Sequence, residues 1–309
     1  MVSEKKYDII HTLMLVMAAF FWGTTFVAQS IGADYVGAYT YLASRSWIAV
    51  AVLLPVMKIF GKEDPVSYEK EEFNIGKIRL SRIQYKLIGG CACGLFLFTA
   101  SGLQQIGMAY TTTAKAGFIT ALYVVFVPVA YLFTGGKVSS KIWLCVIMAV
   151  IGLYLLCMND TLSLNFGDGI ILISSFFFTL QIITVNYFVR KINALILSWT
   201  QFLFTAIVST IVMFIFEQVT AENIINAFPA ILYAGIFSSG VAYTLQILGQ
   251  KGLNPTIASI AMSLESVFSA VSGWIILGEK MTFKECTGAI IMFLAIIISQ
   301  IPLKRKASL

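Results

Sequence analysis

The sequence contains little charge. Asp, Glu, Lys and Arg together make up 12% of its 309 residues, whereas hydrophobic residues make up 59%. A soluble domain carries about 25% charged residues, because its surface must be hydrated. The shortage of charge therefore excludes an ordinary water-soluble fold and indicates that lipid surrounds most of the chain.

Residues that bind metals or form disulfides are also scarce. His11 is the sole histidine, so the Cys91-x-Cys93 pair has no partner set for a metal site. The five cysteines lie within or beside apolar runs, which favours packing roles over a disulfide framework. Without a Walker A motif, ATP-driven pumping is unsupported, and no cofactor or metal is expected.

Ten apolar runs are long enough to cross a bilayer, which needs about 20 apolar residues per helix. They lie at about 9–30, 38–59, 85–107, 112–134, 140–158, 168–189, 194–216, 228–250, 255–277 and 284–302. The predicted fold class is all-α integral membrane, with about ten transmembrane helices. Several connections are short, so successive helices are expected to run antiparallel. Pro128 is expected to kink the fourth helix, because it removes a backbone hydrogen bond.

The basic residues predict which loops face the cytoplasm. Two of the 21 lie within apolar runs (Arg45 and Lys115), and two face the outside (Lys280 and Lys284) if the N-terminus is cytoplasmic. The other 17 then all face inside, which satisfies the positive-inside rule. Both termini, the loop 61–84 and the basic tail 303–309 are therefore predicted to be cytoplasmic in a multi-pass plasma-membrane protein. The loop is too short and too polar to be an enzymatic domain.

The two halves of the chain resemble each other in register. A shift of 142 residues superimposes six pairs: Leu103 on Leu245, Gln104 on Gln246, Gly107 on Gly249, Ala116 on Ala258, Leu122 on Leu264 and Gly136 on Gly278. The sequence thus predicts a five-helix repeat at 1–158 and a second at 168–302. Because five is odd, the second repeat must enter the membrane from the opposite side. Inverted repeats of this kind build two gates around one central site in many secondary transporters.

Short motifs along the chain point to a known family. They are Trp22-Gly23-Thr24-Thr25-Phe26-Val27, Ser44-Arg45, Ser263-Leu264-Glu265-Ser266-Val267-Phe268, Gly273-Trp274 and Leu277-Gly278-Glu279. In this order they resemble the drug/metabolite transporter superfamily, in particular its EamA-type ten-helix permeases. The resemblance implies a duplicated five-helix unit and export of amino acids or other small metabolites. Two departures are Lys137 in the first repeat, where a Gly-Glu is expected, and Ser266, where the family often has proline.

Three charged residues within the apolar runs are candidates for function, because charge at membrane depth is costly. Arg45 and Glu265 are hypothesised to face a central cavity, either paired or with one of them binding substrate. Alternatively, Arg45 snorkels outward and Glu265 is protonated or bonded to a hydroxyl. Lys115, near the outer interface, either snorkels or forms an outer gate that attracts anions. His11 is expected to be a plain interfacial residue.

Uncharged polar and aromatic residues complete the predicted pathway. Gln104 and Gln246 occupy equivalent places in the two repeats, and amides in lipid must face protein or a water-filled cavity. Both substrate contact and helix bridging are open to them, and the same holds for Gln29, Gln181 and Asn186. An aromatic lining is assigned to four residues, with packing as the alternative for each: Trp22, Tyr123, Trp199 and Tyr243.

The leading functional prediction is a secondary transporter that moves a small metabolite by alternating access, with protons as a possible coupling ion. Only the resemblance favours export over import. A membrane-embedded enzyme would need several catalytic groups at one depth, whereas Glu265 is the single clear mid-membrane acid. A lipid flippase or a non-transporting partner protein is the alternative. Its signature would be a groove open to lipid.

Overall fold

A computed structural model of the chain describes residues 2–61, 74–75, 78–111, 113–157, 165–277 and 282–301. Within these ranges the chain is helical apart from turns and one pair of two-residue antiparallel strands, β1 (Asn74–Ile75) and β2 (Ile78–Arg79). The predicted all-α class is confirmed. Most of the loop 61–84, the tail 303–309 and the Gly278-Glu279 pair lie outside the described residues.

The described part of the first half contains six helices. Their bounds are α1 Val2–Ala33, α2 Ala38–Phe60, α4 Arg82–Met108, α5 Thr113–Ala121, α6 Tyr123–Phe133 and α7 Ser140–Cys157. The predicted run 112–134 is thus two helices, α5 and α6, separated at Leu122. The break lies six residues before Pro128, which is within α6.

The second half forms the remaining elements, including one π-helix, η1. Their bounds are α8 Phe166–Phe188, α9 Ala194–Phe216, α10 Ala221–Tyr233, η1 Ala234–Ala242, α11 Tyr243–Gln250, α12 Pro255–Met262, α13 Glu265–Leu277 and α14 Phe283–Gln300. The segment α10–η1–α11 is one continuous helical run. The predicted run 255–277 is again two helices, α12 and α13.

Among the described residues, nine helical segments are long and apolar enough to cross a membrane. The remaining predicted span, 140–158, corresponds to a shorter apolar helix at Ser140–Leu155. Every predicted run is therefore helical, and the apolar side chains that cover the outside of the bundle match a lipid surrounding.

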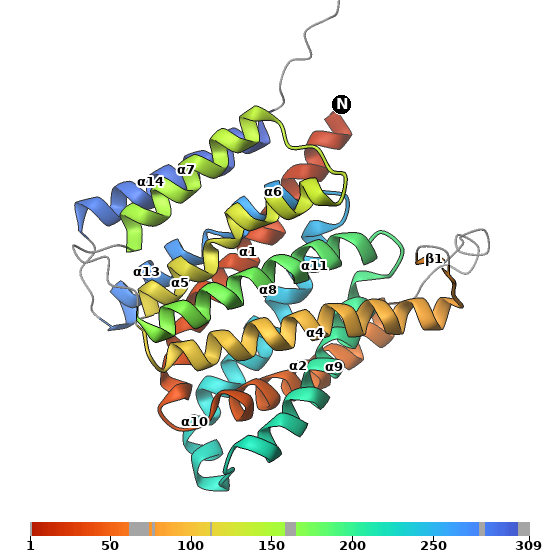
Figure 1. Ribbon diagram of the computed structural model, residues 1–309, viewed down its shortest axis with the longest axis vertical. Helices are drawn as coiled ribbons and strands as arrows, with labels where there is room; N and C mark the ends of the chain where they lie inside the picture. Colours follow the sequence, from red (N-terminus) through yellow and green to blue (C-terminus); the bar gives the residue numbers. More distant parts are fainter. Residues whose placement is uncertain are drawn as a thin grey trace, which may run out of the picture.

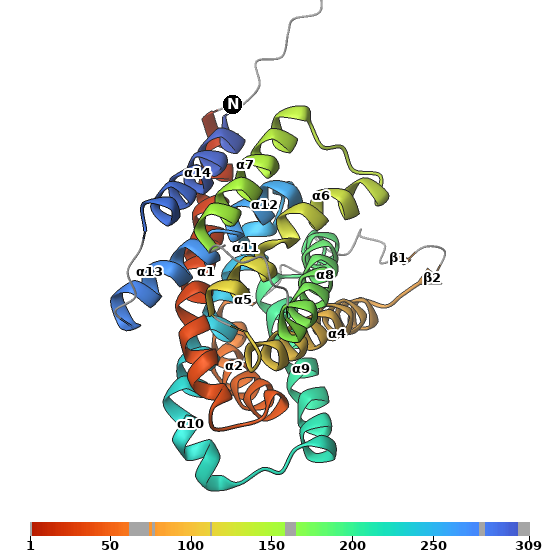
Figure 2. The ribbon, with the colours of Figure 1, turned by 60° about the vertical axis from the view of Figure 1, so that its left-hand side comes forward.

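The helices form one bundle, with α7 and α14 packed together on one flank and α2 and α9 packed together on the other (Figures 1 and 2). Between them, α4 packs on α8 and α1 packs on α13. We call the end at which α1 begins the N-terminal end, and the other the opposite end. Helices α2, α6, α8 and α14 finish at the N-terminal end.

Small residues permit close contacts between membrane helices. A Cβ atom on Gly94 would lie 2.8 Å from the Gln201 carbonyl oxygen of α9, and one on Gly235 would lie 3.1 Å from the Arg45 carbonyl oxygen of α2. Both positions lack room for a side chain, so glycine at each of them allows the neighbouring backbones to pack closely.

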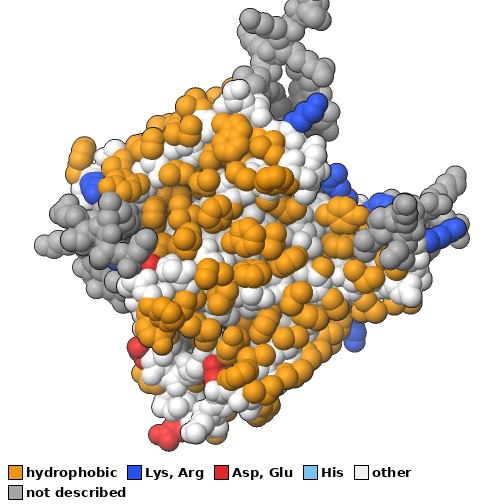
Figure 3. Space-filling model, viewed as in Figure 1, with side chains coloured by type: hydrophobic (Ala, Val, Ile, Leu, Met, Phe, Trp, Pro, Cys, Tyr) orange, Lys and Arg blue, Asp and Glu red, His pale blue; other side chains and the backbone are white. Residues whose placement is uncertain are grey.

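The face of the molecule shown in Figure 3 separates charge by sign. In Figure 3 a hydrophobic band crosses the visible face, Lys and Arg gather mainly along its upper and right-hand edge, and Asp and Glu lie at its lower left. The basic edge coincides with the N-terminal end of the bundle shown in Figure 1. A band of this kind is the surface expected of a protein that lipid surrounds.

Candidate functional site

A small cavity lies in the middle of the bundle. Its wall contains eight of the nine residues predicted to face a pathway: Trp22, Arg45, Gln104, Tyr123, Gln181, Tyr243, Gln246 and Glu265. Helices from both halves of the chain contribute to it. Residues separated by more than 200 positions in the sequence therefore converge on one enclosed polar site.

Two broken helices meet the cavity at equivalent places. In the first half, α5 ends at Ala121 and α6 begins at Tyr123. In the second half, α12 ends at Met262 and α13 begins at Glu265. Tyr123 and Glu265 are 142 residues apart, the same shift that aligns the two halves. Helix breaks at corresponding places in two repeats are a recurring mark of a transporter binding site, because they expose helix ends to the ligand.

In the cavity wall, the Tyr123 hydroxyl lies close enough to the Glu265 carboxyl group for the two to interact electrostatically. Within the described part of the chain, Tyr123 Oη and Glu265 Oε1 are buried and lack a partner that meets hydrogen-bond geometry. The Glu265 side chain is 4% exposed and lies in the first turn of α13, where the helix dipole favours a carboxylate. A buried oxygen atom without a hydrogen-bond partner is favourably placed to accept a hydrogen bond from a donor on a ligand.

Close contact between α1 and α13 fixes the position of Glu265. A Cβ atom on Gly23 would lie 2.5 Å from Phe268 Cβ and 2.7 Å from the Glu265 carbonyl oxygen. Ser266 adds a second anchor, because its hydroxyl donates a 2.9 Å hydrogen bond to the Gly117 carbonyl oxygen of α5. The serine that departs from the family pattern thus joins the two broken helices.

Arg45 is buried in the cavity wall and does not extend to the end of the bundle. It is 3% exposed, and its Cζ lies 5.7 Å from the centre of the Tyr41 ring. Arg45 Nε has no hydrogen-bond partner among the described residues, and Arg45 and Glu265 do not form an ion pair. The cavity therefore presents a cation and a carboxyl group that do not neutralise each other directly.

One group of glutamines is nearly saturated with hydrogen bonds. Gln29 Nε2 donates to Gln104 Oε1 and to Gln105 Oε1, each at 3.1 Å. Gln104 Nε2 donates to Thr120 Oγ1 at 3.0 Å, and Gln105 Nε2 donates to the Gln29 carbonyl oxygen at 3.1 Å. These hydrogen bonds join α1, α4 and α5, so the group forms a fixed part of the cavity wall.

The second group of glutamines keeps unused hydrogen-bonding capacity. Gln246 Nε2 donates to Gln181 Oε1 at 2.9 Å, and Gln181 Nε2 donates to Gln201 Oε1 at 3.3 Å. Gln246 Oε1 and Gln201 Nε2 are buried without partners in the described part of the chain. Of Gln104 and Gln246, which the 142-residue shift aligns, it is therefore Gln246 that offers a free acceptor to a ligand.

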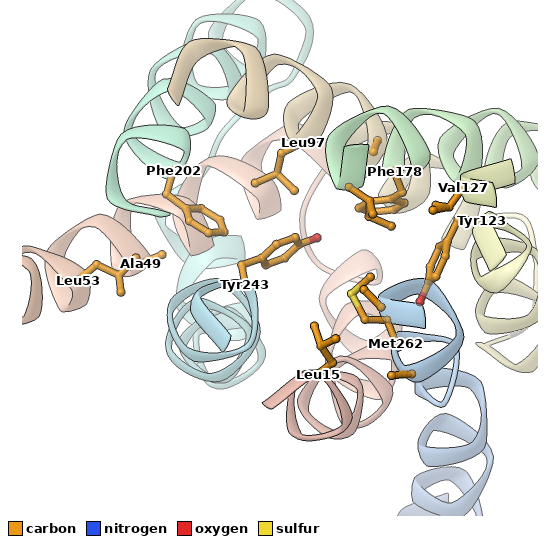
Figure 4. Close-up of a cluster of buried hydrophobic side chains, with 14 of the residues drawn as sticks. Leu15, Ala49, Leu53, Leu97, Tyr123, Val127, Phe178, Phe202, Tyr243 and Met262 are labelled. Atoms are coloured by element: carbon orange, nitrogen blue, oxygen red, sulfur yellow. The ribbon is translucent and has the colours of Figure 1, made fainter. Parts of the chain in front are cut away.

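Aromatic side chains form the apolar part of the wall. The rings of Trp22 and Tyr243 meet edge to face with centroids 4.8 Å apart, and Phe202 packs against Tyr243 at 5.4 Å. Figure 4 shows the Tyr243 hydroxyl pointing into the space enclosed by the helices, with Phe178 and Tyr123 on the far side. Trp22 Nε1 is a buried donor without a partner among the described residues.

Two predicted residues lie outside the cavity. Trp199 packs against the surrounding hydrophobic core and is absent from the cavity wall. Lys115 lies near the opposite end of the bundle, where its Nζ is 3.7 Å from Asp168 Oδ2. Thr111 Oγ1 donates a 2.5 Å hydrogen bond to Asp168 Oδ1, so this buried aspartate connects α5 and its preceding turn to α8.

A second carboxylate connects the two halves at the opposite end. Glu217 follows α9 and accepts hydrogen bonds from the backbone N–H groups of Tyr39 and Thr40, each at 2.8 Å. The Thr40 hydroxyl donates to it as well, at 2.6 Å. Glu217 thereby caps α2, whose own N-cap residue, Gly37, supplies no side-chain bond.

Sequence reasoning did not single out several residues of the site. Cavity-lining residues of this kind are Phe26, Thr120, Phe178, Ile182, Ser238 and Met262. Asp168 and Glu217 were missed at the opposite end. The spacing of Asn165 and Asp168 is a capping-box signal that predicts the start of α8, but no local pattern indicates the contact with Lys115.

Comparison with known proteins identifies the family. The model of the EamA-like transporter family matches the chain twice, at residues 9–158 and 165–300. The chain belongs to the EamA-like transporter family. The earlier resemblance is therefore confirmed, and this EamA-type protein is a multi-pass membrane transporter of small solutes.

Relatives and a solved structure support the same family. An uncharacterized transporter of Archaeoglobus fulgidus is 26% identical over 93% of this chain and 84% of its own length. The uncharacterized transporter YoaV of Bacillus subtilis is 20% identical over 95% of this chain and 98% of its own length. A crystal structure with 15% identity superposes with a TM-score of 0.74, covering 96% of this chain and 98% of that chain, so the fold is shared.

Proposed function

We propose that this EamA-type transporter carries an amino acid or a closely related zwitterion across the plasma membrane by alternating access, in the direction of export. The main support for the proposal is that Arg45 and Glu265 line the same cavity and do not form an ion pair with each other. A free zwitterion offers a carboxylate to the arginine and an ammonium group to the glutamate. The opposite charges make the site selective for a solute that carries both.

The other unpartnered atoms suit the same class of solute. Trp22 Nε1 is a donor only, Gln246 Oε1 is an acceptor only, and Tyr123 Oη is either. A solute with at least two acceptors and two donors satisfies them all. The rings of Trp22 and Tyr243 leave an apolar surface for its side chain. An acyl chain has no groups for this lining, which disfavours lipid movement through the cavity.

Two inverted five-helix repeats, at 1–158 and 168–302, provide the motion in this proposal. Two observations support the layout: the family model matches the chain twice, and the helix breaks at Leu122 and Leu264 are 142 residues apart. Rocking of one repeat against the other would open the cavity to each side in turn. Glu217 and Asp168, which bind the first repeat to the second at one end, are the contacts that outward opening has to release.

The proposed orientation places both termini in the cytoplasm. Lys and Arg gather mainly at the N-terminal end of the bundle, which supports this placement through the positive-inside rule (Figure 3). The opposite end, with Glu217 and Asp168, is then extracellular. Protons are the proposed coupling ion, because a buried carboxyl group such as Glu265 exchanges a proton for a positively charged solute group.

The test is transport by the purified full chain in proteoliposomes. Vesicles are loaded with a labelled mixture of amino acids, organic acids and amines, and release is followed with and without a pH gradient. Selective release of amino acids supports the proposal, and acceleration by the gradient supports proton coupling. Release of only anions or only cations would contradict the zwitterion assignment.

A further inference from the structure

An apolar groove runs along the outside of the bundle, separate from the central cavity. It lies between α4, α6 and α8. Its lining is almost entirely hydrophobic: Phe96, Phe126, Val129, Ala130, Phe133, Phe176, Leu180 and Ile183, with Thr134, Thr179 and Thr184. Phe133, at the mouth, is 88% exposed. We call this surface the lateral groove.

The lateral groove continues into a polar pocket at the N-terminal end of the bundle. This second pocket shares Thr134 and Ile183 with the groove. Arg190, Asn186, Tyr131 and Tyr187 supply its polar groups. Arg190 Nη2 donates a 3.4 Å hydrogen bond to Asn186 Oδ1, which holds the guanidinium over the pocket. The combined surface is apolar along its length and basic at its end.

The position of the groove matches one leaflet of a bilayer. On α8 it extends from Phe176 to Thr184, about 12 Å at 1.5 Å per residue. One leaflet contributes about 15 Å of hydrocarbon. The basic pocket lies where α6 and α8 end, next to the exposed Tyr187, and tyrosine is typical of the membrane interface.

We infer that the lateral groove and its basic pocket bind an anionic phospholipid of the leaflet at the N-terminal end. An acyl chain occupies the groove between Phe126 and Phe176, and the phosphate lies against Arg190. A basic pocket between membrane helices is the feature that selects anionic head groups from neutral ones. The groove covers a single leaflet, so the lipid is held in place and not moved across the bilayer.

The bound lipid would sit at the contact between α6 of the first half and α8 of the second. Val127 and Phe178, next to the groove in sequence, belong to the core that surrounds the central cavity. A lipid in the groove therefore packs against the outer side of α6 and α8, whose inner side belongs to the core around the central cavity. The inference depends on neither the proposed solute nor the direction of transport.

The experiment measures lipid binding by the purified full chain in detergent. Phosphatidylglycerol and phosphatidylcholine with identical acyl chains are titrated, and bound lipid is counted by native mass spectrometry alongside the unfolding temperature. Phosphatidylglycerol is expected to bind more tightly and to raise the unfolding temperature more. Arg190→Gln should weaken phosphatidylglycerol binding about fivefold and phosphatidylcholine binding clearly less, because the choline group offsets the charge of the phosphate. Ala130→Trp, which fills the groove, should weaken binding of both lipids.

Lys58→Gln is the matched control, because Lys58 is an exposed basic residue at the same end of the bundle, outside the groove. It should leave both affinities unchanged. Equal binding of the two lipids, or an equal loss in Arg190→Gln and Lys58→Gln, would overturn the inference. Stabilisation by inorganic phosphate alone to the same degree would also overturn it, since a free anion would then suffice. Arg190 is exposed, so its variant is expected to fold even if Ala130→Trp does not.

Discussion

Tyr123 and Glu265 each start the second part of a broken helix, at equivalent positions in the two halves of the chain, and they are neighbours in the central cavity. The pair brings the two halves into direct contact at the site itself. Neither Tyr123 Oη nor Glu265 Oε1 makes a hydrogen bond of good geometry within the described residues, so a solute can compete for both atoms.

Replacing Glu265 tests whether its carboxylate binds the solute. Glu265→Gln keeps the size of the side chain and removes its charge, so transport is expected to fall about tenfold to a hundredfold, as for loss of one charged hydrogen bond. In the parent protein, solute affinity should fall as the pH is lowered and the carboxylate becomes protonated. The variant should lose this dependence. Proteoliposome uptake measured across a pH series checks both effects.

Tyr123→Phe is the companion to that variant. It removes the hydroxyl and preserves the negative charge, so a smaller loss is expected, about fivefold for one neutral hydrogen bond. The pH dependence of uptake should be retained. An unchanged pH profile in Glu265→Gln, together with full transport, would remove the carboxyl group from the mechanism.

Replacing Arg45 tests recognition of the solute's carboxylate. Arg45→Gln is expected to raise the KM of transport at least tenfold, because a charged, buried donor is lost. Lys58→Gln is the control, since it removes a positive charge from an exposed position. Equal KM values in the two variants would show that Arg45 contributes only to the overall charge of the protein.

Hydropathy alone predicts the helical spans well. The predicted runs 38–59 and 194–216 agree with α2 and α9 to within one residue. The reason is physical: in lipid every backbone group must be bonded within the segment, so a long apolar run has few alternatives to a helix.

The interior of the bundle is harder to predict. No proline or glycine marks the break at Leu122, and Pro128 stays within α6. The nine residues of the π-helix η1 likewise have no counterpart in the hydropathy pattern. Most of the polar residues that line the cavity could be predicted from two features: a charge within an apolar run, and alignment by the 142-residue shift. Both features work because polar groups in lipid must turn toward the protein interior. Trp199 packs against the core that surrounds the cavity and does not line it, because an aromatic ring is equally stable in the core.

Gly23 is expected to be essential for the position of α13. An alanine Cβ at this site would meet Glu265 O at 2.7 Å and Ser269 N at 2.8 Å, so the two helices would have to separate. Gly23→Ala should lower stability by about 1–3 kcal/mol, the usual range for overpacking, and should reduce transport. Thermal unfolding of the purified protein measures the first effect.

Gly169→Ala supplies the control for Gly23. A Cβ atom at Gly169 would have no neighbour within 4 Å, although this residue is also within a helix. The variant should be as stable as the parent or slightly more so, because alanine favours helix. Equal destabilisation of the two variants would show that the close contact with α13 is unimportant.

Glu217 is expected to restrain opening at its end of the bundle. Glu217→Gln removes the charge that caps α2, and a cap is worth about 1 kcal/mol, or a fivefold change in an equilibrium. Labelling of Ser238→Cys in the cavity by a membrane-impermeant reagent should increase by about that factor, in a background without the five native cysteines. Glu222→Gln, an exposed acidic control at the same end, should label like the parent. Identical labelling of all three proteins would exclude Glu217 as a gate contact.

The most direct test of the central claim is solute exchange by the full chain in proteoliposomes, with labelled amino acids compared against organic acids and amines of similar size. The account predicts exchange of amino acids alone, with strong losses in both Arg45→Gln and Glu265→Gln. Equal exchange of an amine or an acid that carries only one charge, or retention of amino-acid exchange in both variants, would contradict a cavity built around a zwitterion.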